Sequence, residues 1–190
     1  MRRTNMKLSF STKGWHDRTF DDFISVAKEF RFSGIELHNV NNKLFTSTDS
    51  AFHDYATAST LRKLYENQLT IPCIDSICDP ADESATEESI KEMMECIRIA
   101  KNLHIPNIRV HAKEHNEKDL ETVKDFLNKI LPIAEESNVT LLFETSGLFC
   151  NTKNLRGLLE TYACDSLSAL GICTQRILLP KKRLKRRLKT

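Results

Sequence analysis

The chain has 190 residues, 40% of them hydrophobic and 28% charged, a composition typical of one globular domain rather than of a disordered chain. Five Gly and five Pro exclude a collagen-like or low-complexity architecture, and no stretch approaches the roughly 18 uncharged apolar residues that span a bilayer. The net charge of +2 is unevenly divided, because residues 181–190 hold seven of the 28 basic side chains and no acidic one. Residues 1–180 therefore carry a formal charge of −5.

The N-terminus and the cysteines both indicate a reducing compartment. Residues 1–7 lead directly into an alternating strand pattern, without the apolar segment that a secretory signal places behind its basic residues. The cysteines form no C-x-x-C pair, and scattered thiols in a reducing cytosol are usually small core residues; they are Cys73, Cys78, Cys96, Cys150, Cys164 and Cys173. We expect a cytoplasmic protein without a disulfide framework.

The predicted elements alternate between strand and helix along the chain. The first strand is expected over 7–12, and Thr19 is expected to cap a helix over 20–30 whose apolar side chains share one face. The same patterns predict further strands over 34–38, 69–76, 107–111 and 139–144. After a polar connection over 39–57, further helices are predicted over 58–68, 87–103, 120–136 and 154–162.

This alternation predicts an α/β protein with a parallel sheet and right-handed crossovers. A dinucleotide-binding sheet would carry a glycine-rich turn after its first strand, whereas residues 11–15 contain only Gly14. The other architecture is the (β/α)8 barrel, which takes about 250 residues when closed. A chain of this length accommodates five to six consecutive parallel β-α units, and we expect an incomplete (β/α)8 TIM barrel.

Polar side chains recur near the C-terminal ends of the predicted strands, where a barrel of this kind builds its active site. They are Glu36 and His38, Asp75, Arg109 and His111, and Glu144. Glu36 and His38 alternate with Ile35 and Leu37, which places both on the interior side of a half-buried strand. We expect Glu36, Asp75, His111 and Glu144 to gather at one end of the sheet.

Three segments carry a resemblance to a known family: FSGIELH at 32–38, AKNLHIPNIRVH at 100–111 and AEESNVTLLFET at 134–145. In order and spacing they resemble the xylose-isomerase-like TIM barrel superfamily. This superfamily contains sugar and sugar-phosphate isomerases and epimerases, and the family 2 AP endonucleases, which cleave at apurinic sites. The resemblance covers about residues 7–170.

The resemblance implies chemistry on a divalent metal, with Glu144 as a metal ligand and as the acid/base that exchanges a proton beside the substrate carbonyl. Mn²⁺ or Mg²⁺ is implied rather than Zn²⁺, because hard cations prefer carboxylate oxygens and stabilise an enediolate. His111 resembles a second metal ligand. The substrate-binding residues implied are Glu36, His38, Asp75 and Arg109. Read without the resemblance, a lone Glu such as Glu144 is most often a solvated charge or the partner of a helix N-terminus, and a single histidine such as His111 is more often a hydrogen-bonded structural residue.

Two departures from the family pattern bear on the function. The endonuclease branch has a histidine near the end of strand three, where this chain reads Ile74-Asp75-Ser76, and this argues against a multinuclear zinc nuclease. No Asp follows residue 165, no Glu follows 160 and no His follows 115, so the ligands of late strands are missing. We expect a partial, C-terminally truncated barrel over 1–170 and a divergent, basic, disordered tail over 171–190. Either a frameshift or a true short form of the protein would explain this C-terminal sequence.

Three functions follow, in order of preference. The first is a metal-using sugar or sugar-phosphate isomerase/epimerase-like protein, impaired by truncation. The second is a non-catalytic remnant or binding module, and the third an apurinic-site endonuclease-like nuclease, supported by His111, Glu144 and the tail. The expected partners are a small-molecule sugar, a second copy bound through open sheet edges, and nucleic acid bound weakly and non-specifically by the basic tail. No membrane partner is expected.

Overall fold

The structure, a computed structural model, describes residues 6–15, 18–38, 50–113 and 119–171. Within these residues six parallel strands form one sheet in the order of the sequence. They are β1 (Ser9–Ser11), β2 (Gly34–His38), β3 (Ile74–Asp75), β4 (Asn107–Val110), β5 (Thr140–Glu144) and β6 (Leu167–Leu170). Each strand pairs with the next one along the chain, so β1 and β6 are the edges of the described sheet.

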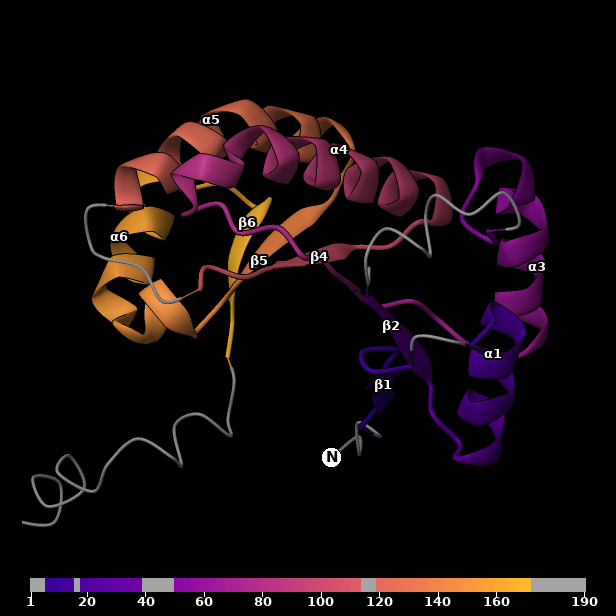
Figure 1. Ribbon diagram of the computed structural model, residues 1–190. Coiled ribbons are helices and arrows are strands. Elements are labelled where there is room, and N and C mark those ends of the chain that lie inside the picture. Colours follow the sequence, from indigo (N-terminus) through magenta and orange to yellow (C-terminus); the bar gives the residue numbers. More distant parts are fainter. Residues whose placement is uncertain (1–5, 16–17, 39–49, 114–118, 172–190) are drawn as a thin grey trace, which may run out of the picture.

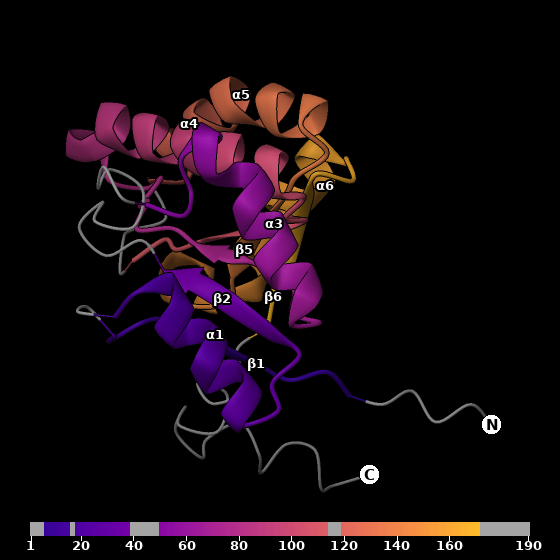
Figure 2. The same cartoon turned by 90° about the vertical axis from the view of Figure 1, so that its right-hand side faces the viewer.

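The helices lie outside the curved sheet, as Figures 1 and 2 show. They are α1 (Phe20–Glu29), α3 (Thr57–Glu66), α4 (Thr86–Leu103), α5 (Leu120–Glu136) and α6 (Thr152–Tyr162), with 3-10 turns η1 (Asp54–Ala56), η2 (Glu83–Ala85) and η4 (Gly147–Cys150). Helix α3 contacts α4, and α4 contacts α5, so the outer layer is continuous there. Consecutive parallel strands wrapped by helices form an incomplete (β/α)8 barrel, which confirms the predicted fold.

The two faces of the sheet differ in chemistry, because successive side chains of a strand point to opposite faces. The face toward the helices, here called the core face, is apolar. Its fully buried strand residues are Ile35, Leu37, Ile74, Ile108, Val110, Leu141 and Phe143. The alternate positions of β2 and β4 turn to the other side, here called the inner face, which corresponds to the interior of a closed barrel.

Four helices end in the same way, with a non-glycine residue in the left-handed conformation. These residues are Arg31, Gln68, His104 and Asn138, with φ between 54° and 57°. In each case the backbone N–H of the next residue donates a hydrogen bond to the carbonyl five residues earlier. An example is the 2.9 Å bond from the N–H of Leu69 to the carbonyl oxygen of Leu64. This repeated turn directs the chain from each helix into the following strand.

Most predicted elements are confirmed within a residue or two, and Thr19 caps α1 with the side chain of Asp22 in a reciprocal capping box. The strand predicted over 69–76 was wrong in extent, since β3 contains only Ile74–Asp75. Pro72 has no N–H to donate, and the segment before β3 contacts β2 through separate hydrogen bonds, such as that from Ile35 N to Thr70 O.

Two further findings concern the described residues as a group. Their cysteines are free, with Cys73, Cys78 and Cys96 buried as predicted, Cys164 half-buried and Cys150 exposed. Among the same residues, no helix combines the length and the apolar character that crossing a membrane requires. The predicted tail over 171–190 lies, from residue 172 onward, outside the described residues.

Candidate functional site

The register of the parallel strands brings the predicted site residues together at the C-terminal ends of β2 to β5. His38 on β2 pairs with Asp75 on β3, and Asp75 pairs with Arg109 on β4. Glu36 lies two residues before His38, His111 lies two residues after Arg109, and Glu144 ends β5. These six side chains form one ion-paired group, here called the inner-face cluster, because parallel strands all end at the same edge of a sheet.

Asp75 lies at the centre of the inner-face cluster, with a side chain that is 0% exposed. One carboxylate oxygen accepts a 2.8 Å hydrogen bond from Nδ1 of His38, and the other accepts a short hydrogen bond from Nε2 of His111. Burial alone would raise the pKa of Asp75, but the hydrogen bonds from His111 and His38 outweigh it and hold the pKa below its ordinary value. Asp75 is therefore a buried carboxylate whose environment favours its charged form.

Arg109 connects three carboxylates of the cluster. Its Nε and Nη2 lie 2.7 Å and 2.5 Å from Oε2 of Glu144. Its Nη1 lies 3.6 Å from Glu36, and its Nε lies 3.7 Å from Asp75. Since its side chain is 19% exposed, this guanidinium is largely removed from bulk water and its ion pairs are weakly screened.

His111 bridges the two most buried carboxylates, with Nε2 on Asp75 and Nδ1 at 2.9 Å from Oε2 of Glu144. The hydrogen bonds to Asp75 and Glu144 raise the pKa of His111 to about 9, against the opposing effect of burial. Burial would raise the pKa of Glu144, yet the hydrogen bonds from His111, Arg109 and Ser146 lower it to about 2. At neutral pH the pair is an imidazolium and a carboxylate.

The loop after β5 holds Glu144 next to the loop after β4. The backbone N–H of Leu148 lies 3.3 Å from the carbonyl of Ala112 and 3.0 Å from that of Lys113. Between them Gly147 adopts a φ of +48°, and a Cβ there would stand 1.8 Å from the Ala112 oxygen. Only glycine fits this approach, so the loop contact that follows His111 depends on Gly147.

Sequence reasoning missed two residues that follow β1. The Oγ1 of Thr12, which is 2% exposed, accepts a 2.9 Å hydrogen bond from the backbone N–H of His38. Lys13 places its Nζ 3.7 Å from Asp75. The signal was present, since a polar Ser-Thr-Lys run follows the first strand, as polar residues follow the others. In the sequence, the run was used only as evidence against a glycine-rich phosphate-binding turn.

A divalent metal fits the donor types of the cluster but not their arrangement. Carboxylate and imidazole are suitable ligands, yet Arg109 and His111 already contact the same oxygen of Glu144. Within the described residues, no three His, Cys, Asp or Glu side chains are arranged to hold a metal ion. The strand next to Glu144, β6, reads Leu-Ser-Ala-Leu and adds no metal-binding side chain.

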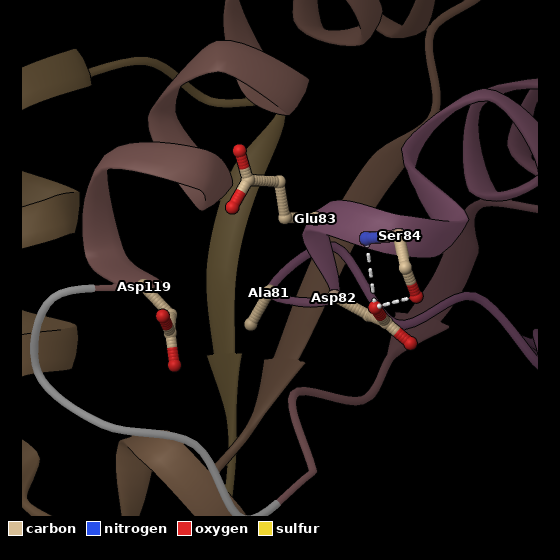
Figure 3. Close-up of a pocket in the computed structure, with 5 residues that line it drawn as sticks. All are labelled: Ala81, Asp82, Glu83, Ser84 and Asp119. Carbon is tan, nitrogen blue, oxygen red and sulfur yellow. Dashed lines mark hydrogen bonds between the residues drawn. The ribbon is translucent and has the colours of Figure 1, made fainter.

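A separate pocket opens at the same end of the strands, as Figure 3 shows. Its lining comes from the loop after β3, from η2 and from the residue before α5: Ala81, Asp82, Glu83, Ser84 and Asp119. One Asp82 oxygen accepts hydrogen bonds from the backbone N–H and the hydroxyl of Ser84. The lining shares no residue with the inner-face cluster, and three of its five side chains are acidic, which disfavours an anionic ligand.

The sheet order and the cluster define a barrel protein whose candidate site lies at the C-terminal ends of its strands. The family model described as xylose isomerase-like TIM barrel matches residues 24–173, so the chain belongs to this family. Among curated protein sequences, none matches the chain.

Solved structures resemble this one in fold. The probable 3-DHS dehydratase AsbF from Bacillus anthracis is 22% identical, with a TM-score of 0.65 over 87% of this chain and 62% of that one. The 3-keto-D-glucoside 4-epimerase YcjR from E. coli is 13% identical, with a TM-score of 0.71 over 95% of this chain and 73% of that one. The chain thus spans about three fifths to three quarters of the length of these structures.

Metals occur among the similar structures. A xylose isomerase-like TIM barrel protein from Mycobacterium smegmatis was solved in complex with magnesium; it is 10% identical, with a TM-score of 0.67 over 87% of this chain and 64% of that one. The IOLI protein, 15% identical with a TM-score of 0.65 over 85% of this chain and 61% of that one, was solved with a zinc atom. At these identities the likeness concerns the fold alone.

Proposed function

We propose that the chain is a sugar or sugar-phosphate isomerase/epimerase-like protein, and that the inner-face cluster forms the sugar-binding part of its site. The observation that carries this proposal is the gathering of Glu36, Asp75, Arg109, His111 and Glu144 at the C-terminal strand ends. Carboxylates accept hydrogen bonds from sugar hydroxyls, and the N–H groups of Arg109 donate to sugar oxygens. With Nδ1 of His38 donating to Asp75, its Nε2 accepts from a sugar hydroxyl.

The proposed reaction uses Glu144 and His111 as a proton-transfer pair. Glu144 takes the proton from the carbon beside the substrate carbonyl, and the imidazolium of His111 gives its proton to the carbonyl oxygen, so that an enediol forms. Return of the proton from Glu144 to the neighbouring carbon, while His111 takes back the proton of the hydroxyl on that carbon, yields the isomer. Return of a proton to the original carbon on its opposite face yields the epimer. The raised pKa of His111, about 9, supports the acid role, because the group keeps its proton at neutral pH.

The same contacts support the proposal that the activity is impaired. A general base works best when its pKa is near the working pH, whereas that of Glu144 is about 2. A substrate hydroxyl must therefore take over the contact of His111 or Arg109 before Glu144 can accept a proton.

The proposal names the residues that would hold a divalent metal, although their present arrangement does not fit one. Mn²⁺ or Mg²⁺, rather than Zn²⁺, would be held by Glu144 and His111 and would polarise the substrate carbonyl. In the present arrangement these residues do not fit an ion, since His111 directs both ring nitrogens to carboxylates. The proposed proton transfers therefore run between the substrate and the side chains of Glu144 and His111.

The test is sugar binding together with exchange of the carbon-bound hydrogen in deuterated water. We expect D-fructose or its 6-phosphate to broaden the His111 ring signals in NMR spectra, with slow deuterium uptake beside the carbonyl. Glu144→Gln should abolish the uptake and leave binding detectable, whereas Glu136→Gln, at an exposed position of α5, should change neither. Binding without any uptake would favour the second candidate, a non-catalytic binding module, which the complete pairing of the carboxylates also supports.

The remaining partners are proposals as well. We propose that β1 and β6, the open edges of the described sheet, allow a second copy to associate, and that residues 1–170 form the barrel portion of a cytoplasmic protein. The basic segment 181–190 lies outside the described residues, and we propose weak, salt-sensitive binding of nucleic acid to it. Metal-dependent cleavage of an abasic-site duplex would instead support the nuclease candidate.

A further inference from the structure

Glu144 has more cationic contacts than the proposed proton transfer uses. Its Oε2 is approached by Nε and Nη2 of Arg109 and by Nδ1 of His111, all within 2.9 Å. The side chain is only 5% exposed, so water has little access to it. Three N–H groups converging on one buried oxygen occupy the side of the carboxylate from which a cation would bind.

Arg109 also has the position of a central cation. Its guanidinium lies within 3.7 Å of three carboxylates that come from three different strands, Glu36 on β2, Asp75 on β3 and Glu144 on β5. A divalent ion shared by these groups would need the same central place. The guanidinium thus offsets one of the three negative charges, and Nζ of Lys13 lies 3.7 Å from Asp75.

We propose that Arg109 is the built-in cation of this site and competes with divalent metal for Glu144, so that metal binding and the Arg109–Glu144 ion pair exclude each other. A guanidinium and a metal ion cannot occupy the same side of one carboxylate oxygen. Either cation can offset the negative charge of that oxygen, so one replaces the other. The inference concerns the resting protein and holds whether or not the chain turns over a sugar.

Removal of the guanidinium should expose the metal-binding capacity of the cluster. Glu36, Asp75 and Glu144 would then keep three negative charges in a poorly hydrated place, with the more exposed Lys13 ammonium 3.7 Å from Asp75. Repulsion between such carboxylates is relieved either by protonation or by a bound cation. Mn²⁺ supplies that cation and accepts carboxylate oxygens as ligands.

The experiment is a Mn²⁺ titration without sugar, followed by calorimetry and by the electron paramagnetic resonance signal of free Mn²⁺. Arg109→Gln should bind Mn²⁺ at least tenfold more tightly than the wild-type chain. Adding Glu144→Gln to this variant should remove the gain. Arg98→Gln is the matched control, because Arg98 also pairs with two carboxylates, Glu95 and Asp54, and its loss should leave Mn²⁺ affinity unchanged.

Two results do not depend on the folding of Arg109→Gln. In the wild-type chain, Glu144→Gln should leave the weak Mn²⁺ affinity unchanged, and Arg109→Lys, which keeps the positive charge, should gain less than twofold. The proposal is overturned if Glu144→Gln abolishes wild-type Mn²⁺ binding. It is equally overturned if a folded Arg109→Gln gains no affinity. Neither result bears on the sugar exchange assay, so the two proposals fail separately.

Discussion

The two faces of the sheet are built from the same strands and have opposite chemistry. On the core face, Ile108 and Val110 of β4 are fully buried among apolar side chains. On the inner face, Arg109 and His111 from the same segment enter a network of charges. A period of two along a strand separates the residues that stabilise the fold from those available for binding and catalysis.

The difference between the faces concerns the origin of stability. Burial of apolar area stabilises the core face without directional requirements, whereas the inner-face cluster is stable only while each buried charge keeps a partner. Substitutions on the core face should therefore act through lost volume, and substitutions on the inner face through unpaired charge. Four predictions, in order of expected size, test this contrast.

The largest effect is expected for Phe143→Ala on the core face. Phe143 is 0% exposed and its ring packs edge-on against Phe149, with centroids 5.3 Å apart. The cavity should lower the free energy of unfolding by about 4 kcal/mol, measured by urea denaturation. The matched control is Leu142→Ala, the half-buried neighbour on the inner face, which should cost less than half as much. Equal losses would contradict the assignment of the two faces.

The next effect is expected for Asp75→Ala on the inner face. This variant leaves His111 and Arg109 without their buried partner and should lower the free energy of unfolding by about 3 kcal/mol. Its control is Asp21→Ala, which removes an exposed ion pair with Lys63 of 2.6 Å and should cost at most about 0.5 kcal/mol. Similar values for the two variants would show that the cluster contributes no more than a surface salt bridge.

The third effect is a dependence of stability on pH to which His111 and Glu144 of the inner-face cluster contribute. The pKa of His111 is raised from 6.5 to about 9, so its stabilisation is complete below pH 6.5 and is lost as the pH rises through 9. The pKa of Glu144 is lowered from 4.5 to about 2, so its stabilisation is complete above pH 4.5 and is lost as the pH falls through 2.

Stability should therefore be highest between about pH 4.5 and 6.5 and fall by on the order of 2 kcal/mol toward pH 9. Urea midpoints across this range measure the effect. His111→Gln should flatten the alkaline decline, and Phe143→Ala should shift the whole curve without changing its shape. If the stability of His111→Gln still fell toward pH 9 as that of the wild-type chain does, the decline would belong to other titrating groups.

The smallest effect is expected at the opposite end of the sheet, where the helices return to the strands. Gln68 holds a φ of 55°, which costs a residue with a Cβ more than it costs glycine. Gln68→Gly should raise the free energy of unfolding by about 0.7 kcal/mol, measured by thermal denaturation. Asn138→Gly at the equivalent turn should gain less, because asparagine tolerates this conformation better. A loss in both variants would contradict the strain at these turns.

Much of the fold was accessible from local pattern. The apolar spacing over 120–136 predicted the bounds of α5, and Thr19 was identified as the cap of α1. Periodicity and capping are properties of a few neighbouring residues, so the sequence carries them directly. The extent of β3 was overestimated because Pro72 has no N–H to donate, so the segment before β3 pairs with β2 only through separate hydrogen bonds.

The gathering of Glu36, Asp75, His111 and Glu144 at one end of the sheet was also predicted, because consecutive parallel strands must end on the same side. Their roles as ligand, base or substrate contact stay predictions. What the tertiary structure decided is which charges meet. Arg109 and Glu144 are 35 residues apart and come together on Oε2 of Glu144, and Lys13 from the loop after β1 lies near Asp75. Such contacts depend on strand register and on side-chain direction together. Alternation along a strand indicates the direction, but no local sequence pattern contains the register.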